Sequence, residues 1–173
     1  MTSPAGVAEH CDAVRDRLVG ALTLATGDRS VAEELAQEAL VRTWQHWDSV
    51  AAMDSPEGWT FRVGFNLAGS WRRRRAAELR ANRRGRPVLE SSDPPSAEAV
   101  ALRQAVAELP ARQRSTVIAR YYLGLDVAGT AELLGCAAGT VKSATAQAIA
   151  NLRAAGLGDL PEEDGSELEE VTP

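Results

Sequence analysis

The chain has 173 residues, of which 45% are hydrophobic and 25% charged, a balance that is ordinary for globular proteins and excludes a wholly disordered chain. No apolar run approaches the roughly 20 residues of a membrane span, and the N-terminal residues lack the basic start and apolar core of a secretion signal. The two cysteines and two histidines are not clustered, which argues against a disulfide framework and against a metal site. We therefore expect a reduced, cytoplasmic location and no cofactor.

The net charge of −5 conceals two opposite clusters. Between residues 72 and 86, eight arginines stand against one acid, Glu78, whereas residues 159–170 contain seven acids and no base. Without those seven acids, the rest of the chain holds 19 basic and 17 acidic residues, a net charge of about +2. This pattern favours a polyanionic partner and a tail that repels or masks it, although a merely solvated surface is the simpler interpretation of the tail alone.

Apolar residues recur at three- and four-residue steps along most of the chain, and this period predicts an all-α fold. The first helix is expected to end near Thr26, before Gly27. The second is expected to open at a capping box in which Ser30 is the cap, and to run to about Trp47. The third starts at Pro56, whose missing N–H costs nothing in the first turn.

Proline, glycine and serine gather in residues 85–96, the only clear linker. We expect two small helical domains, at residues 5–80 and 97–155. A flexible basic segment at 81–96 would join them, and a disordered acidic tail at 156–173 would follow.

One face of the third helix combines aromatic, basic and amide side chains, which suits stacking on an unpaired base and hydrogen bonding to its edge. The residues of this face are Trp59, Arg62, Asn66 and Ser70. Four successive arginines follow and cannot share one face at about 100° per residue. The helix is therefore expected to leave the packed body there and to contact phosphates through Arg72, Arg73, Arg74 and Arg75.

In the second domain, two helices near residues 127–134 and 138–153 have the spacing of a helix-turn-helix, with Gly135 in the turn. The periodicity places Val141, Thr145, Ala148 and Leu152 on the inner face of the second of these helices. Its outer face, where a recognition helix meets base edges, then holds Thr140, Lys142, Ser143, Ala146 and Gln147. An ordinary helical hairpin fits this spacing equally well.

Taken together, the motifs resemble those of the extracytoplasmic-function (group 4) RNA polymerase sigma factors of the sigma-70 superfamily, and the Ser70-Trp71-arginine run is similar to their SigE-like actinobacterial subgroup. Residues 32–40 with Trp44 resemble region 2.2, and residues 54–59 and 66–75 resemble regions 2.3 and 2.4. Regions 4.1 and 4.2 are resembled by residues 109–110, 121–125, 134–136 and 139–143.

The resemblance implies a promoter-specificity subunit that is not itself an enzyme. An acidic-amide patch on the second helix, which alone would be read as a solvated face, would dock on the β′ clamp helices of core RNA polymerase through Glu34, Gln37, Glu38 and Arg42. The loop from Ser49 to Asp54 and the third helix would read and open the −10 element of promoter DNA, with Asn66 matching a base-contacting residue. The second domain would read the −35 element and touch the β flap. An anti-sigma factor is a further candidate partner, no membrane is implied, and the free protein is expected to be a monomer.

The chain departs from the family pattern in the recognition helix. Ala144 and Gln147 stand where relatives usually carry arginine, Ala137 offers no side-chain cap, and Gly129 inside the preceding helix predicts a cost of about 1 kcal/mol. Val50 lies in the base-reading loop where some relatives have an aromatic residue. We therefore expect weak −35 binding.

Two alternatives to the promoter-specificity subunit stay open. One is a stand-alone helix-turn-helix transcriptional regulator, and the other is a degenerate sigma-like adaptor that binds polymerase or another protein without reading promoters. The patch on the second helix distinguishes the first of these, because a free regulator needs no polymerase-binding surface.

Overall fold

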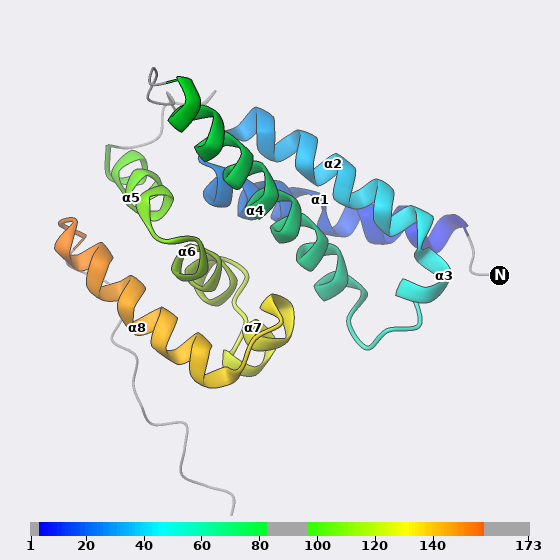
Figure 1. Ribbon diagram of the computed structural model, residues 1–173. Coiled ribbons are helices and arrows are strands. Elements are labelled where there is room, and N and C mark those ends of the chain that lie inside the picture. The colour runs from blue at the N-terminus through cyan, green and yellow to red at the C-terminus, as the bar shows by residue number, and fades with distance from the viewer. Residues whose placement is uncertain (1–3, 83–96, 158–173) are drawn as a thin grey trace, which may run out of the picture.

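The computed structural model describes residues 4–82 and 97–157, which form helices and no strand, so the predicted all-α fold is confirmed (Figure 1). The first helical unit consists of α1 (Pro4–Thr26), α2 (Arg29–Gln45), the short α3 (Trp47–Val50) and the long α4 (Pro56–Asn82). The second consists of α5 (Ala97–Glu108), α6 (Ala111–Val117), a π-helical turn η1 (Ile118–Tyr122), α7 (Val127–Leu134) and α8 (Ala138–Ala154). Most of the predicted linker and acidic tail lies outside the described residues.

Glycine and proline mark the helix boundaries where the sequence predicts them. Gly27 follows α1 with φ +79°, and Gly135 ends α7 with φ +63°, a left-handed conformation that costs glycine little. Pro56 is the first residue of α4, and the Ser55 hydroxyl accepts a hydrogen bond from the Gly58 N–H at 3.0 Å. These local signals therefore fix where α1 and α7 end and where α4 begins.

The predicted capping box at Ser30 is wrong. The N-cap of α2 is Asp28, whose carboxylate accepts from the Val31 N–H at 3.1 Å, and Ser30 is already within the helix. Glu33 does not reach back to the cap; it pairs with Arg29 at 2.9 Å. Asp28 and Ser30 are equally good caps, so local preference alone could not choose between them. The helix also ends at Gln45, before Trp47.

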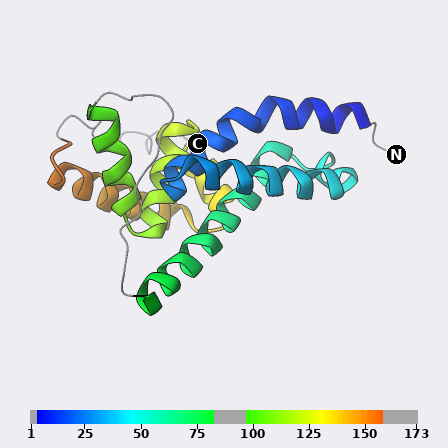
Figure 2. The same cartoon turned by 90° about the horizontal axis from the view of Figure 1, so that it is seen from above.

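The two helical units share one apolar core. Leu18, Leu22 and Phe61 of the first unit belong to the same buried cluster as Ile118 and Leu133 of the second. Close packing within the first unit depends on Gly64 of α4, because a Cβ there would lie 2.9 Å from a methyl carbon of Leu18 on α1. The C-terminal part of α4 extends away from this packed body (Figure 2).

A buried arginine links two helices of the second unit by hydrogen bonds. Arg114 of α6 is 4% exposed and donates to the carbonyls of Ala107 at 2.7 Å and Leu109 at 2.9 Å, at the C-terminal end of α5. Burial, followed by the nearby charge of Arg72, lowers the pKa of Arg114 to about 10. The guanidinium is thus still charged at neutral pH, and helix carbonyls rather than a carboxylate compensate it.

Replacing Arg114 by Ala is expected to lower the free energy of unfolding by about 2–4 kcal/mol, because it removes the side-chain donor of the Leu109 carbonyl and one of the two donors of the Ala107 carbonyl, and opens a cavity. Urea denaturation followed by circular dichroism measures this change. Arg112→Ala is the matched control, since Arg112 lies on the same helix and is exposed. Equal unfolding midpoints for the two variants would contradict the structural role of Arg114.

Candidate nucleic-acid interface

The four residues predicted to contact polymerase lie on the outer face of α2. The helix buries Ala32, Ala36, Ala39, Leu40 and Thr43. The opposite side exposes Glu34, Gln37, Glu38 and Arg42, and Arg42 pairs with Glu38 at 2.8 Å. We call these four residues the α2 patch. Val41 and Trp44, 45% and 56% exposed, extend the exposed surface of α2 with apolar side chains.

An open groove of about 1580 Å³ runs along the same side of the molecule. Its walls come from both helical units, because α1 and α2 supply Val19, Leu40, Val41 and Trp44, whereas the second unit supplies Leu102 and Tyr122. Gln37 also lines it. The α2 patch therefore borders an amphipathic groove, a feature that the charged residues of α2 did not reveal, although Val41 and Trp44 are its signal in the sequence.

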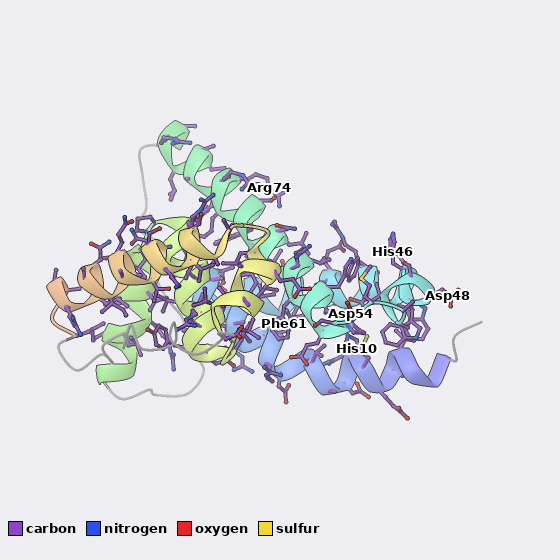
Figure 3. All side chains as sticks on the ribbon, turned by 90° about the horizontal axis from the view of Figure 1, so that it is seen from below. His10, His46, Asp48, Asp54, Phe61 and Arg74 are labelled. Atoms are coloured by element: carbon purple, nitrogen blue, oxygen red, sulfur yellow. The ribbon has the colours of Figure 1, made fainter. Side chains whose placement is uncertain are left out.

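The loop between α2 and α4 lies at the far end of α4 from its arginines, as the labelled His46, Asp48, Asp54 and Arg74 show (Figure 3). Val50 is fully buried, so it anchors this loop and is not placed to read a base. The exposed side chains of the predicted reading loop are Ser49, Ala52, Met53 and Asp54.

Two threonine hydroxyls and a histidine ring form a hydrogen-bonded group near the start of α4, which follows that loop. The Thr60 hydroxyl lies 3.1 Å from that of Thr43 and 3.0 Å from Nε2 of His10. Burial lowers the pKa of His10, although the carboxylate of Glu57 partly opposes the shift. A neutral His10 can therefore hydrogen-bond Thr60 at neutral pH and help to fix the start of α4 against α1 and α2.

The predicted base-reading face of α4 is only partly available. Asn66 is exposed and Trp59 and Ser70 are half-buried. Arg62, however, is directed at the second helical unit, where its Nε donates to the Leu133 carbonyl at 3.1 Å and its Nη2 donates to the Glu132 carbonyl. In this conformation the Arg62 guanidinium is thus hydrogen-bonded to the C-terminal end of α7, although the residue remains exposed.

The four successive arginines divide into two groups. Arg73, Arg74 and Arg75 are exposed on the part of α4 that projects from the body, as predicted from their spacing (Figure 3). Arg72 instead donates to the carbonyls of Ala25 at 3.0 Å and Ala107 at 3.0 Å. The expectation that all four face phosphates is therefore wrong for Arg72 in this conformation, because packing of the second unit buries one side of the helix.

Helix α8 presents the predicted outer face. Lys142, Ser143, Ala146 and Gln147 are exposed and Thr140 is half-exposed, while Val141, Thr145, Ala148 and Leu152 are buried as predicted. No side chain caps the helix at Ala137, also as predicted. The Gln147 amide is held by Gln113 of α6 at 3.3 Å.

Two of the departures from the family pattern have a different physical meaning from the one expected. Ala144 is 6% exposed and points inward, so its side chain is not at the DNA-facing surface. Gly129 lies in the capped first turn of α7, where its N–H donates to the Asp126 carboxylate at 2.7 Å. A Cβ on Gly129 would come within 3.1 Å of that carboxylate, so glycine is not a simple loss of stability there.

Sequence patterns alone missed two arginines that organise the site. Arg17 of α1 pairs with Glu57 of α4 at 2.5 Å, donates to the Leu123 carbonyl at 3.4 Å and lies over the ring of Phe61. Arg114, described above, binds the same Ala107 carbonyl as Arg72. Isolated arginines on otherwise polar helix faces carry no local signal of such contacts.

Among residues 4–82 and 97–157, no helix has both the length and the apolar character needed to cross a membrane. No group of three or more histidine, cysteine or acidic side chains suited to hold a metal ion occurs within those same ranges.

Comparison with known proteins gives one consistent family. Residues 12–78 match the family Sigma-70 region 2, and residues 99–152 match the family Sigma-70, region 4. The RNA polymerase sigma-E factor of Streptomyces avermitilis is 31% identical over 146 residues, which cover 84% of this chain and 82% of that protein. The ECF RNA polymerase sigma factor SigL of Mycobacterium tuberculosis is 34% identical over 136 residues, 74% of this chain and 76% of that protein.

Solved structures agree on the fold. The sigma factor RpoE of Bartonella quintana, solved in complex with the anti-sigma factor NepR, superposes with a TM-score of 0.75 at 24% identity, over 88% of this chain and 97% of that one. CnrH, solved with the cytosolic domain of CnrY, superposes with a TM-score of 0.65 at 20% identity, over 91% and 92% of the two chains. Both sigma-70 regions are thus present in the order found in relatives of similar length, and the chain belongs to the extracytoplasmic-function sigma factors of the sigma-70 superfamily.

Proposed function

We propose that this sigma factor directs promoter-specific initiation through three surfaces. The α2 patch binds the β′ clamp helices of core RNA polymerase, α4 with the preceding loop reads and opens the −10 element, and α8 reads the −35 element while the second unit touches the β flap. The protein supplies binding energy, against a cost of a few kcal/mol for each base taken out of the stack. It is not itself an enzyme, and it works where the polymerase is, in the bacterial cytoplasm.

The observation that carries this proposal is the exposed amide of Asn66 on a helix that continues into Arg73, Arg74 and Arg75. An amide can hydrogen-bond the edge of an unpaired base, while the guanidiniums bind the phosphates that position the strand. Region 4 is expected to contribute less of the DNA-binding energy than region 2, because the exposed face of α8 offers one charged side chain, Lys142, among the residues predicted to read DNA.

The decisive experiment is transcription from fragmented genomic DNA of the same bacterium by purified core polymerase, with and without the protein, followed by sequencing of the RNA 5′ ends. New start sites that share an upstream sequence are expected only when the protein is present. Polymerase binding without new start sites would favour the adaptor, and DNA binding without polymerase binding would favour the stand-alone regulator.

An anti-sigma factor is also proposed as a partner, with the groove beside the α2 patch as its docking surface. The groove combines apolar side chains with charges from Asp12, Arg15, Asp16 and Arg103. Such a surface suits an amphipathic helix, which would then compete with polymerase for α2.

Removing the acidic tail is expected to raise the affinity of the protein for duplex DNA at low salt. The tail carries seven acids between residues 159 and 170 and follows α8 directly, so it repels phosphates or occupies nearby arginines. The gain should fade at high salt, because charges are screened over about 10 Å at 0.1 M. Truncation should follow Leu157, which packs against the core.

The control for this prediction is a full-length variant in which the seven tail acids are replaced by their amides. Fluorescence anisotropy of labelled DNA at two salt concentrations compares the three proteins. Truncated and amidated variants should bind alike and more tightly than the parent at low salt, and identical affinities of all three would show that the tail has no electrostatic role.

A further inference from the structure

We propose that Gln113 of α6 sets the base preference of the recognition helix α8, because its amide holds the Gln147 side chain with the NH2 group toward DNA. This role rests on the proposed function of α8 as the reader of the −35 element. It gives a task to a residue of α6 that the sequence does not place in DNA contact, and it names guanine as the base that Gln147 favours.

Three amide side chains form a hydrogen-bonded row across α6 and α8. The Asn151 Nδ2 donates to the Gln113 Oε1 at 2.8 Å, and the Gln113 Nε2 donates to the Gln147 Oε1 at 3.3 Å. Gln147 and Asn151 are four residues apart on α8, so they lie one above the other on one face of the helix. Gln113 therefore bridges two successive turns of the recognition helix from a neighbouring helix.

The start of α6 explains why the Gln113 amide is available to α8. Gln113 is the third residue of α6, a position from which a glutamine side chain can bond back to the N–H of the N-cap residue. The N-cap here is Pro110, which has no N–H. The usual local partner is thus absent, and both ends of the amide are used by α8 instead.

The direction of this row determines what Gln147 offers to a ligand. Its Oε1 accepts from Gln113, whereas its Nε2 has no acceptor among residues 4–82 and 97–157. The residue is exposed on the same outer face of α8 as Lys142, Ser143 and Ala146. Gln147 therefore offers a pair of N–H donors, not the mixed donor and acceptor of a freely rotating amide.

A pair of donors distinguishes guanine from adenine in the major groove. Guanine presents two neighbouring acceptors, N7 and O6, whereas adenine presents the N7 acceptor beside the N6 amino donor. A glutamine that can use both of its ends favours adenine, because its carbonyl accepts from N6 while its NH2 group donates to N7. The carbonyl of Gln147 is turned to Gln113, so its NH2 group meets acceptors at both positions only on guanine.

Ser143 supplies an internal reference on the same face of α8. Its hydroxyl donates to the Thr140 carbonyl at 3.1 Å, within the helix itself. The orientation of this hydroxyl thus depends on α8 and not on α6. A change at Gln113 should therefore alter the base preference where Gln147 contacts DNA and leave it unaltered where Ser143 does.

The first test follows the side-chain amides of the full-length chain by proton–nitrogen NMR correlation, without DNA or polymerase. Gln147→Glu and Asn151→Asp identify the two NH2 groups by removing their signals. The Gln147 signals should have the exchange rate of a solvated amide, and Gln113→Leu should leave them in place while it shifts those of Asn151. In Gln113→Glu they should move downfield, because a carboxylate only accepts and the Gln147 NH2 group must turn toward it.

The second test measures base preference in the holoenzyme. A promoter found by the transcription experiment carries a randomised −35 element, and a barcode in the transcribed part reports each template by RNA sequencing. Gln147→Ala identifies the position that Gln147 contacts, because the preference is lost there. The parent protein should favour guanine over adenine at this position by about fivefold or more, the lower end for a bidentate base contact. Gln113→Glu, which turns the Gln147 carbonyl outward, should reverse the order.

Ala111→Glu is the matched control, because Ala111 is exposed two residues earlier on α6 and receives the same added charge. Both acids lie in the first turn of α6, where a negative charge is favourable, and circular dichroism checks that both variants fold. Ala111→Glu should keep the preference for guanine.

Movement of the Gln147 amide signals in Gln113→Leu would show that the row runs in the opposite direction and would overturn the proposal. So would a Gln147→Ala variant with an unaltered −35 preference, or a Gln113→Glu variant that still favours guanine. Absence of promoter-specific transcripts with the parent protein would overturn the proposed function, and with it the base preference, while the amide signals would still show whether Gln113 holds Gln147.

Discussion

Replacing Gln37 by Ala and Glu38 by Lys is expected to abolish assembly with core RNA polymerase and to leave the helix content unchanged. Both side chains are exposed on α2 and contribute nothing to its buried face. The reversed charge at residue 38 would also turn the ion pair with Arg42 into a repulsion next to the docking surface. Loss of one side of a desolvated charge pair at an interface costs about 2–5 kcal/mol, enough to weaken binding by roughly 30- to 5000-fold.

Size-exclusion chromatography of the protein with core enzyme measures assembly, and circular dichroism measures helix content. Glu9→Lys is the matched control, because Glu9 is exposed on α1 of the same region and the charge change is the same. Undiminished co-elution of the double variant with core enzyme would exclude the α2 patch as the polymerase-binding surface. A variant that elutes as an unfolded protein would instead place these residues in the fold.

The helix order could be predicted because its signals are local. Gly27 and Gly135 take positive φ angles that other residues avoid, and Pro56 fits only the first turn of a helix. The start of α2 could not be fixed in the same way. Asp28 and Ser30 are both strong caps, so local preference does not choose between them, and the structure uses Asp28, whose carboxylate accepts from the Val31 N–H.

The π-helical turn η1 had no signal in the sequence. It follows α6 without a break, so the periodicity from Pro110 to Leu123 reads as one ordinary helix. The wider turn buries Ile118 and Ala119 while leaving Tyr121 and Tyr122 exposed. Tyr122 thereby reaches both the groove and Gly20, a contact that depends on the distant α1.

The sequence predicts which site residues share a helix face, but it does not predict how the helices are placed against one another. Spacing along α4 places Arg62 and Asn66 on one face, and both do lie on the outside of region 2. They differ in their hydrogen bonds, because the end of α7 accepts from the Arg62 guanidinium, while both residues remain exposed. Such contacts join residues about seventy positions apart, and no local pattern encodes them.

Replacing Asn66 by Ala is expected to leave polymerase binding intact and to lower the fraction of open promoter complexes. The Asn66 side chain is exposed and makes no hydrogen bond to residues 4–82 or 97–157, so its loss leaves no partner there unsatisfied and the fold should be unaffected. One lost base contact costs about 1–3 kcal/mol, which corresponds to roughly a 5- to 150-fold smaller opening constant.

Permanganate footprinting of unpaired thymines in the −10 region measures opening at a promoter found by the transcription experiment. Gln104→Ala is the control, because it removes an exposed amide from α5, outside the reading helix. Asn66→Asp sharpens the test, since it keeps the size of the side chain but replaces the amide donor with a negative charge that repels the strand. If Asn66 contacts a base, Asp should impair opening at least as much as Ala, whereas equal thymine reactivity in all four proteins would show that the −10 element is opened by other residues of α4 or of the preceding loop.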